Sequence, residues 1–172
     1  MNTNDTDLAA RVQRLEDERN VVATLYRYGH AIDSGDEEAW LDCFTEDGSF
    51  TAAGRREGHT MFTVTGREEL RSFIAGHTRR PYAFHSHCVI EPLVEVDGDE
   101  AHCESYLFVL QEHERDPRLR VFGRYSDDLV RGEDGRWRFK LRSAAIDGML
   151  RGLPALVDGM PPEARSDAPV KG

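Results

Sequence analysis

The chain has 172 residues, of which 39% are hydrophobic, enough for one apolar core but too few for two full domains. Its formal net charge of −10 argues against nucleic acid and anionic membrane surfaces as partners, because both attract basic proteins. The composition therefore favours a soluble, single-domain protein that binds small molecules.

Nothing at the start of the sequence resembles a targeting signal, since the first residues are polar and no apolar stretch follows them. No segment has the roughly 20 apolar residues that a membrane-spanning helix needs. Cys43, Cys88 and Cys103 are odd in number and lack metal-type spacing, which is typical of buried free thiols in a reducing compartment. We therefore expect a cytoplasmic protein.

Two helices are predicted first. Apolar residues recur at helical spacing from Asp7 to Ser34, which predicts one long helix or two in tandem. Gly35 is a typical residue after a helix end. Asp36 can cap a second, short helix that carries Trp40. This part of the chain therefore predicts a helical hairpin.

A short β-hairpin and a third helix are predicted next. The turn signal Asp47–Gly48 precedes the segment 49–52, and a second apolar segment, 61–64, follows a polar link rich in glycine. Residues 66–76 then have the pattern of a helix.

Beyond Pro81 the pattern changes to long strands joined by short turns, which predicts an antiparallel meander. In the last strand apolar and basic residues alternate, so one face is predicted to be buried and the other wet. The pair Arg79–Arg80 is also expected to be solvated. The strands are expected at residues 84–96, 101–112, 119–131 and 136–147.

This order of elements predicts an α+β protein whose N-terminal helices pack in a curved antiparallel sheet. Such a sheet wraps around the helices as a cone-shaped α+β barrel with an internal pocket. We expect residues 1–150 to form this single domain. Residues 151–172 become rich in proline and polar residues, and they are expected to form a covering segment and a flexible tail.

Asp33 is in an unfavourable place for a carboxylate, because the dipole of the first predicted helix is negative at its C-terminal end. A histidine whose protonated form the carboxylate stabilises would compensate this cost. His85 and His87 lie two residues apart on the first long strand, so they project from the same face. The residues alone predict an acid–base pair of Asp33 with one of these histidines.

Several segments resemble the nuclear transport factor 2-like, SnoaL-like superfamily of small cone-shaped proteins. They cover roughly residues 15 to 147. They comprise Tyr28-x4-Asp33-x2-Asp36-x3-Trp40-x3-Phe44-x2-Asp47-Gly48, then Gly66-Arg67, then His87, and Gly123-Arg124-Tyr125-x-Asp127-x-Leu129-x5-Gly135-x-Trp137. These motifs are specific for the fold and much less so for the reaction, because the fold hosts many activities.

Within this superfamily the chain is most similar to the scytalone dehydratase, bile acid 7α-dehydratase and hexachlorocyclohexane dehydrochlorinase families. These are lyases in which an Asp and a His perform an elimination without metal or organic cofactor. The resemblance implies that His87 takes a proton, that Asp33 orients it, and that Tyr28 donates to the leaving oxygen or to the enolate. It also implies that no cofactor is needed and that the substrate is a hydrophobic cyclic molecule such as a steroid, terpenoid or polyketide.

The pocket is expected to be lined by aromatic residues that exclude water. Tyr125 and Arg124 lie on opposite faces of their strand, and we prefer Tyr125 as the pocket residue. His85 is expected near the pocket mouth or in a structural role. The other expected substrate-binding residues are Phe50, Phe62, Tyr106, Phe108 and Trp137.

Two alternative functions remain. His85-x-His87-x3-Glu91-x6-Gly98 spells the first metal-binding motif of the cupins, although Pro92 interrupts the strand and the helices do not fit an all-β barrel. The chain also resembles the β subunit of ring-hydroxylating dioxygenases, which would make it a non-catalytic accessory or small-molecule-binding protein. For an enzyme and for a non-catalytic protein alike, the resemblance implies a homodimer or homotrimer, because exposed sheet faces in this superfamily usually pair.

Overall fold

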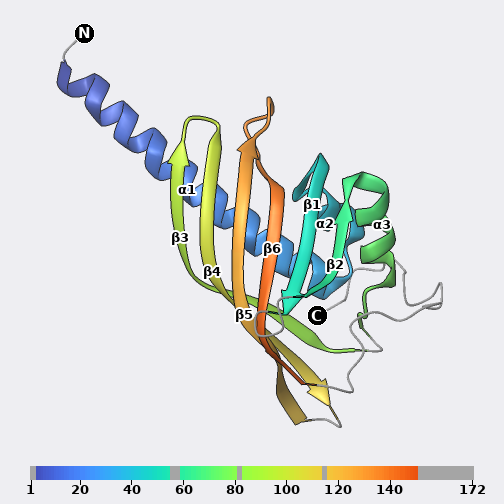
Figure 1. The fold of residues 1–172 in the computed structure, drawn as a ribbon. Helices are drawn as coiled ribbons and strands as arrows, with labels where there is room; N and C mark the ends of the chain where they lie inside the picture. The colour runs from blue at the N-terminus through green and yellow to red at the C-terminus, as the bar shows by residue number, and fades with distance from the viewer. Residues whose placement is uncertain (1–2, 55–58, 81–82, 114–115, 151–172) are drawn as a thin grey trace.

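The computed structural model describes residues 3–54, 59–80, 83–113 and 116–150, and the expected C-terminal covering segment at 151–172 lies outside them. The described part is an α+β fold in which helices pack against a curved six-stranded sheet (Figure 1). Every predicted helix and strand is present. The elements are α1 (Thr3–Ser34), α2 (Glu37–Leu41), β1 (Phe44–Gly54), β2 (Thr60–Thr65), α3 (Gly66–Gly76), β3 (His85–Asp97), β4 (Glu100–His113), β5 (Asp116–Arg131) and β6 (Trp137–Met149).

The N-terminal hairpin consists of α1, which is one continuous helix, and the short α2. Gly35 ends α1 with a left-handed φ of 76°, which a glycine adopts without strain. The Asp36 side chain then accepts a hydrogen bond from the Ala39 backbone N–H at 3.0 Å and so begins α2. None of the described helices is both long enough and apolar enough to cross a membrane.

The first turns of α1 extend past the sheet, as Figure 1 shows. The apolar side chains of Leu8, Val12 and Leu15 are consequently exposed, although their spacing suits a buried stripe. Continuous burial of the apolar stripe begins at Val21, where the helix reaches the inner face of the sheet. The C-terminal half of α1 therefore carries the part of the helix that forms the core.

The strand order is β2-β1-β6-β5-β4-β3. Neighbouring strands are antiparallel except β1 and β6, which pair in parallel. The sheet is thus mixed where the sequence predicts an antiparallel one, because β1 reaches β6 only after a long connection through α3 and four strands. The sheet is also open, since β2 and β3 stand at the two ends of this order and do not pair with each other.

A β-bulge in β6 reverses the predicted faces of that strand. The register with β5 shifts between Phe139 and Leu141, so Lys140 is an extra residue. One extra residue moves every following side chain to the other face. Arg142, predicted on the wet face, is instead fully buried, with its guanidinium carbon 3.6 Å from the centroid of the Tyr125 ring.

Arg79 is also buried, and the expectation that it is solvated is wrong. It ties the end of α3 to the junction of α1 and α2. Its Nη1 donates to the Gly35 carbonyl at 3.1 Å and to Glu37 Oε1 at 2.9 Å, and its Nη2 donates to the Ile74 carbonyl at 2.8 Å. Arg80, the next residue, is exposed.

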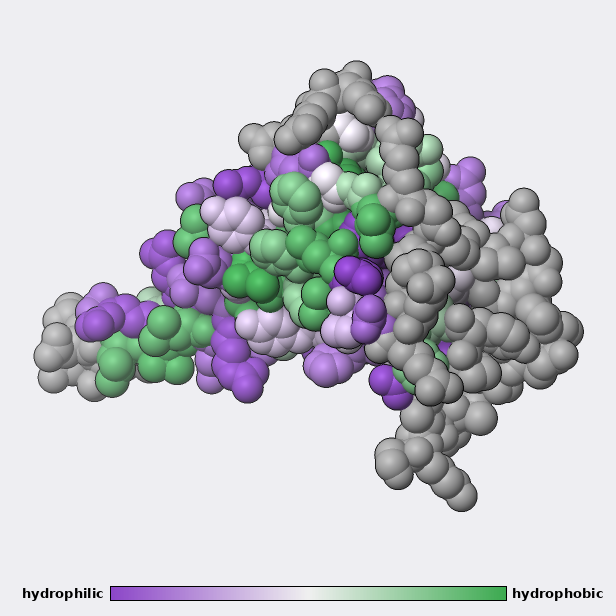
Figure 2. Space-filling view, turned by 90° about the horizontal axis from the view of Figure 1, so that it is seen from below, coloured by the Kyte–Doolittle hydropathy of each residue, from purple (hydrophilic) through white to green (hydrophobic). Residues whose placement is uncertain are grey.

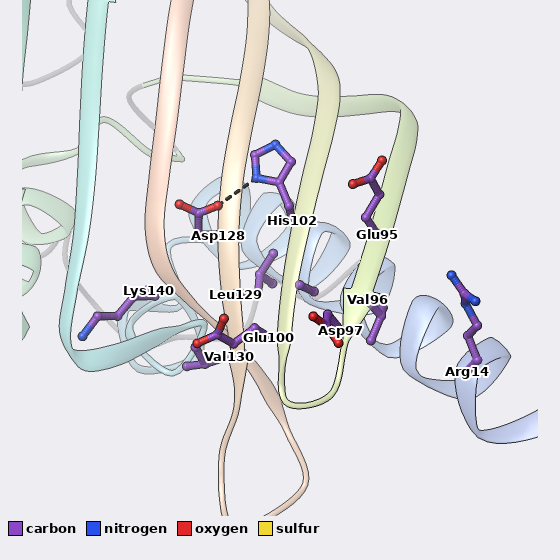
Figure 3. Close-up of a pocket in the computed structure, with 11 residues that line it drawn as sticks. Arg14, Glu95, Val96, Asp97, Glu100, His102, Asp128, Leu129, Val130 and Lys140 are labelled. Atoms are coloured by element: carbon purple, nitrogen blue, oxygen red, sulfur yellow. Dashed lines mark hydrogen bonds and ion pairs between the residues drawn. The ribbon is translucent and has the colours of Figure 1, made fainter. Parts of the chain in front are cut away.

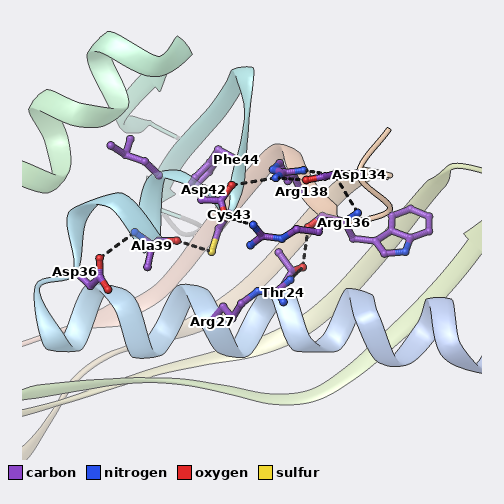
Figure 4. A network of polar contacts seen from close by, with 12 residues as sticks. Thr24, Arg27, Asp36, Ala39, Asp42, Cys43, Phe44, Asp134, Arg136 and Arg138 are labelled. Carbon is purple, nitrogen blue, oxygen red and sulfur yellow. Dashed lines mark hydrogen bonds and ion pairs between the residues drawn. The ribbon is translucent and has the colours of Figure 1, made fainter. Parts of the chain in front are cut away.

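Polar contacts join α1, the start of β1 and β6 (Figure 4). Thr24 Oγ1 donates to the Trp137 carbonyl at 2.8 Å. Arg138 Nη2 donates to Asp42 Oδ1 at 3.0 Å and to Asp134 Oδ2 at 2.8 Å. The Thr24 bond therefore holds α1 against β6, and the bond of Arg138 with Asp42 holds β6 against the end of α2.

The three cysteines are free thiols, as the sequence predicts. Cys43 and Cys103 are buried, whereas Cys88 is partly exposed. Burial raises the pKa of the Cys43 thiol to about 11 and that of the Cys103 thiol to about 12. Both buried thiols are therefore protonated and chemically inert at neutral pH.

Candidate active site

Asp33 and His87 meet where the end of α1 lies against the start of β3. The His87 backbone N–H donates to both carboxylate oxygens of Asp33, at 3.1 and 3.0 Å. His87 Nδ1 lies 2.7 Å from Asp33 Oδ1. These donors offset the unfavourable position of a carboxylate at the C-terminal end of a helix.

The contact with Asp33 determines the tautomer of His87. An ionised carboxylate can only accept a hydrogen bond, so Nδ1 carries the proton and donates it. The lone pair of a neutral His87 ring is then on Nε2, the nitrogen remote from Asp33. A histidine held in this way can accept a proton at Nε2 while the carboxylate stabilises the resulting imidazolium.

Gly29 determines how closely α1 approaches β3. A Cβ atom at this position would lie 2.9 Å from the His87 backbone oxygen, closer than Cβ atoms come to other atoms in proteins. Asp33 follows about one helical turn later and therefore lies on the same side of α1. The absence of a side chain at Gly29 thus allows Asp33 to reach both donors of His87.

Two further histidines surround His87. The centroids of the His85 and His77 rings lie 5.2 and 5.5 Å from that of His87. His85 Nε2 is 3.6 Å from Asp33 Oδ1, which is too far for a hydrogen bond. His77, directly after α3, belongs to no motif, and reasoning from the sequence missed it.

The rings of His85 and His77 are neutral near pH 7. Burial, and next the neighbouring His87, lower the pKa of His85 to about 4 and hold that of His77 well below its usual value. His77 Nδ1 lies 2.9 Å from the Thr78 carbonyl oxygen, which can only accept. His77 therefore carries its proton on Nδ1 and keeps a lone pair on Nε2.

An apolar cavity of ≈ 380 Å³ lies beside His87, between α1, α3 and the inner face of the sheet. Its volume is within the range of about 300–1,000 Å³ that is usual for small-molecule sites. The expected residues Tyr28, Phe50, Phe62 and Tyr125 line it together with His87. His85 does not line this cavity, and instead borders a groove of ≈ 530 Å³ that Asp33 and His87 also line.

Tyr28 lies in the cavity wall, fully buried among other rings. The centroids of the Tyr28 and Tyr125 rings are 6.4 Å apart, and the Arg142 guanidinium carbon is 4.1 Å from the centroid of Tyr28. Burial raises the pKa of Tyr28 well above 10. Tyr28 is therefore a neutral phenol that can donate a hydrogen bond but releases its proton with difficulty.

Besides His85, three more of the expected substrate-binding residues lie outside the cavity. Tyr106 and Phe108 alternate along β4 with Leu107 and Val109, which line the cavity, so they project from the opposite face of the sheet. Trp137 is buried against an earlier part of α1 and does not line the cavity either. The period of a strand shows which residues share a face, but not which face is inward.

Asp33, His85 and His87 offer three possible metal-ligand atoms within 4.8 Å of one another. The cupin interpretation required Glu91 as the third ligand, but Glu91 is exposed where the register of β3 with β4 shifts, and the fold is not that of a cupin. A metal on His87 Nδ1 would also have to replace the proton of the 2.7 Å contact with Asp33. The three residues are therefore better suited to proton transfer.

Arg120 is a second cavity residue that the sequence did not reveal. It lies on β5, is buried, and lines the cavity beside Val121. Its Nη1 donates to Gln111 Oε1 on β4 at 2.7 Å. Strict alternation along β5 would have placed Arg120 on the outer face with Phe122.

Another hollow, of ≈ 730 Å³, is polar and lies at the hairpin end of β3, β4 and β5 (Figure 3). Charged side chains such as Glu95, Asp97 and Lys140 surround it, and His102 Nδ1 lies 2.8 Å from Asp128 Oδ1. These groups are largely exposed, so water screens their charges. Its pair of His102 and Asp128 is thus less shielded from water than the partly buried pair of His87 and Asp33.

The outer face of the sheet carries an apolar patch. Figure 2 shows apolar residues gathered in the middle of the molecule as seen from below. Cross-strand pairing places the members on one face, and most of them are exposed. They are Ile90, Tyr106, Phe108, Leu110, Leu119 and Phe122.

A family model described as a SnoaL-like domain matches residues 13–143. No curated protein matches the chain. Among solved structures, an NTF2-like protein with a cystatin-like fold from Novosphingobium aromaticivorans is 27% identical, with a TM-score of 0.71, and the match covers 88% of this chain and 93% of that one.

Two further structures from the same organism are similar in fold. One is named for the β subunit of an aromatic-ring-hydroxylating dioxygenase, with 18% identity, a TM-score of 0.72, and coverage of 84% of this chain and 99% of that one. The other is named for scytalone dehydratase, with 19% identity, a TM-score of 0.64, and coverage of 86% and 97%. At these identities the likeness concerns the fold alone.

Proposed function

The chain belongs to the SnoaL-like domain family, and we propose that it is a cofactor-independent lyase or isomerase acting on a hydrophobic cyclic small molecule. The observation that carries the proposal is the 2.7 Å contact of Asp33 with His87 at the wall of an apolar cavity. An oriented histidine base and a water-excluding pocket are what proton abstraction from carbon requires.

In the proposed reaction His87 Nε2 takes a proton from the carbon next to a carbonyl group. The electron pair of the broken C–H bond moves to the carbonyl oxygen and forms an enolate, and Asp33 stabilises the imidazolium. For an elimination, the enolate reforms the carbonyl and expels the β-hydroxyl group, which takes the proton from His87 and leaves as water. For an isomerisation, His87 returns the proton to another carbon.

Tyr28 is proposed to donate a hydrogen bond to the enolate oxygen. Its raised pKa keeps the phenol protonated, which suits a donor that is not required to give up its proton. The rings of Phe50, Phe62 and Tyr125 would hold the apolar body of the substrate and exclude water. The lone pair of His77 Nε2 adds a neutral acceptor for a substrate hydroxyl.

A suitable probe is 3-hydroxy-1-tetralone, a cyclic β-hydroxyketone whose dehydration yields fluorescent 1-naphthol. We expect the protein to accelerate both naphthol formation and, in deuterated water, exchange of the protons next to the carbonyl. His87→Gln should lower both rates by about 10²–10⁴-fold, because it removes the base. Asp33→Asn should lower them by about 10²-fold or more, because it removes the charge that stabilises the imidazolium.

His102→Gln is the matched control, since His102 is exposed on the other side of the sheet and pairs with a carboxylate of its own, Asp128. This variant should keep the wild-type rates. Equal rates in His87→Gln and wild type would contradict the mechanism. Exchange without naphthol formation would favour an isomerase over a dehydratase.

A second candidate function is that of a non-catalytic accessory subunit. The apolar patch on the outer face favours a protein partner of some kind, since monomers rarely expose such surfaces. We propose that a second copy of the chain covers this face. Light scattering after gel filtration should show a homo-oligomer, and Phe122→Glu should dissociate it. A monomer that forms a stable complex only with a larger protein would support the accessory role instead.

A further inference from the structure

Arg120 points into the cavity because of a β-bulge in β5. Val109 of β4 pairs with Val121, and Leu110 pairs with Leu119, so Arg120 has no partner across the strands. In such a bulge the extra residue is turned away from the alternating pattern. Both Arg120 and Val121 are therefore buried and line the cavity, whereas Leu119 is exposed on the outer face.

Among the described residues, Arg120 is a buried cation that has no carboxylate partner. The two other buried arginines of the described chain each have one, since Arg79 Nη1 lies 2.9 Å from Glu37 and Arg142 Nη1 lies 3.6 Å from Asp127. Arg120 is only 5% exposed, yet in the described residues its guanidinium bonds only to the neutral amide of a glutamine.

A buried charge without a counter-ion is costly, so an arginine kept in this state is suited to an anion from outside the protein. Arg120 is also the only Asp, Glu, Lys or Arg among the described residues that line the cavity. The rest of the described wall is apolar apart from tyrosine hydroxyls and histidine rings. The cavity therefore combines an apolar body with a single guanidinium group.

We propose that Arg120, oriented by Gln111, forms an anion subsite in this cavity, which selects ligands with a carboxylate on a hydrophobic ring system. This inference rests on the proposed function only in that the cavity is the ligand site. A guanidinium suits a carboxylate because its planar set of N–H donors matches the two oxygens. The Gln111 side chain accepts from Nη1 at 2.7 Å and fixes the guanidinium, which leaves its other N–H groups to donate to a ligand.

The test compares naphthalene-1-acetate with naphthalene-1-acetamide, which have the same ring and nearly the same shape but differ in charge. Titration calorimetry should show about 10–100-fold tighter binding of the acid, the range that a charged hydrogen-bonded pair gives. Arg120→Met should reduce this preference to about threefold or less, because it removes the charge and keeps much of the apolar stem. Arg120→Lys should retain part of it, as a point charge without the planar donor set.

Arg124→Met is the matched control, because Arg124 lies on the same strand but on the outer face, with its guanidinium carbon 4.4 Å from the centroid of Tyr106. It should leave the preference unchanged. If Arg120→Met does not fold, as judged by thermal melting, the wild-type comparison of acid with amide decides alone. Equal affinity for the two probes, no binding of either, or a preference that persists in a folded Arg120→Met variant would overturn the subsite.

The preference for the acid over the amide is measured independently of the proposed reaction. Tight binding of the acid by a protein that neither exchanges nor dehydrates 3-hydroxy-1-tetralone would support the subsite and contradict the lyase or isomerase. Turnover of the ketone with no preference for the acid would do the reverse.

Discussion

Replacement of Gly29 by alanine should disturb the approach of Asp33 to His87, the proposed catalytic pair, while the chain still folds. The new Cβ would lie 2.9 Å from the His87 backbone oxygen, whereas ordinary contacts begin near 3.4 Å. Helix α1 or strand β3 must therefore move by several tenths of an ångström. Alanine favours a helix over glycine by about 0.5–1 kcal/mol, but overpacking of this kind costs about 1–3 kcal/mol.

Gly76→Ala provides the comparison, because Gly76 is also helical and a Cβ there meets nothing within 4 Å. We expect Gly76→Ala to be neutral or up to about 1 kcal/mol more stable than wild type, and Gly29→Ala to be about 1–3 kcal/mol less stable than Gly76→Ala. Urea unfolding followed by the fluorescence of the buried Trp40 and Trp137 measures both.

Gly29→Ala should also slow turnover of 3-hydroxy-1-tetralone about tenfold or more, since small displacements of a base weaken catalysis strongly. Gly76→Ala should not change the rate. If Gly29→Ala were as stable and as active as Gly76→Ala, the close approach of α1 to β3 at this glycine would not control the distance between Asp33 and His87.

Two further predictions concern buried charge. Burial, and next His87, lower the pKa of His85 to about 4, so the folded state binds fewer protons than the unfolded state between that value and about 6.5. The neutral ring therefore stabilises the fold above pH 6.5, and the advantage of wild type over His85→Gln should shrink by up to about 3 kcal/mol as the pH falls to 4. Urea unfolding at several pH values measures this, and a difference that does not vary with pH would refute it. Arg79→Ala should cost about 2–4 kcal/mol because it leaves Glu37 and backbone carbonyls without their donor, whereas Arg80→Ala should stay within about 0.5 kcal/mol in the same assay. Equal effects of the two substitutions would show that the buried network adds nothing.

The elements of the fold could be predicted from local signals. Gly35 and Asp36 mark the boundary between α1 and α2, and the apolar periods mark the strands. The parallel pairing of β1 with β6 could not, because it joins segments that are far apart in the sequence and leaves no trace in the pattern of either. The sequence pattern therefore indicates whether a segment forms a helix or a strand more directly than it indicates which strand that segment pairs with.

The candidate site was predicted only where side chains follow the regular period or the family resemblance. Asp33 came from both, whereas the choice of His87 over His85 came from the resemblance. Arg120 and Arg142 were missed for the same physical reason, since each follows or forms a bulge, and one extra residue reverses the faces of a strand. Tyr106 was assigned to the pocket because period alone does not distinguish the inner from the outer face.

The Asp33 carboxylate contacts His87 in two ways, through hydrogen bonds from the backbone N–H and through a hydrogen bond from the imidazole. The backbone hydrogen bonds can form with any amino acid at position 87 except proline, which has no N–H. The junction of α1 and β3 therefore does not depend on the imidazole. Evolution could therefore exchange the imidazole for an inert side chain, or for a different base, without having to rebuild the scaffold. This separation offers a physical route by which one architecture can serve both enzymes and proteins that only bind.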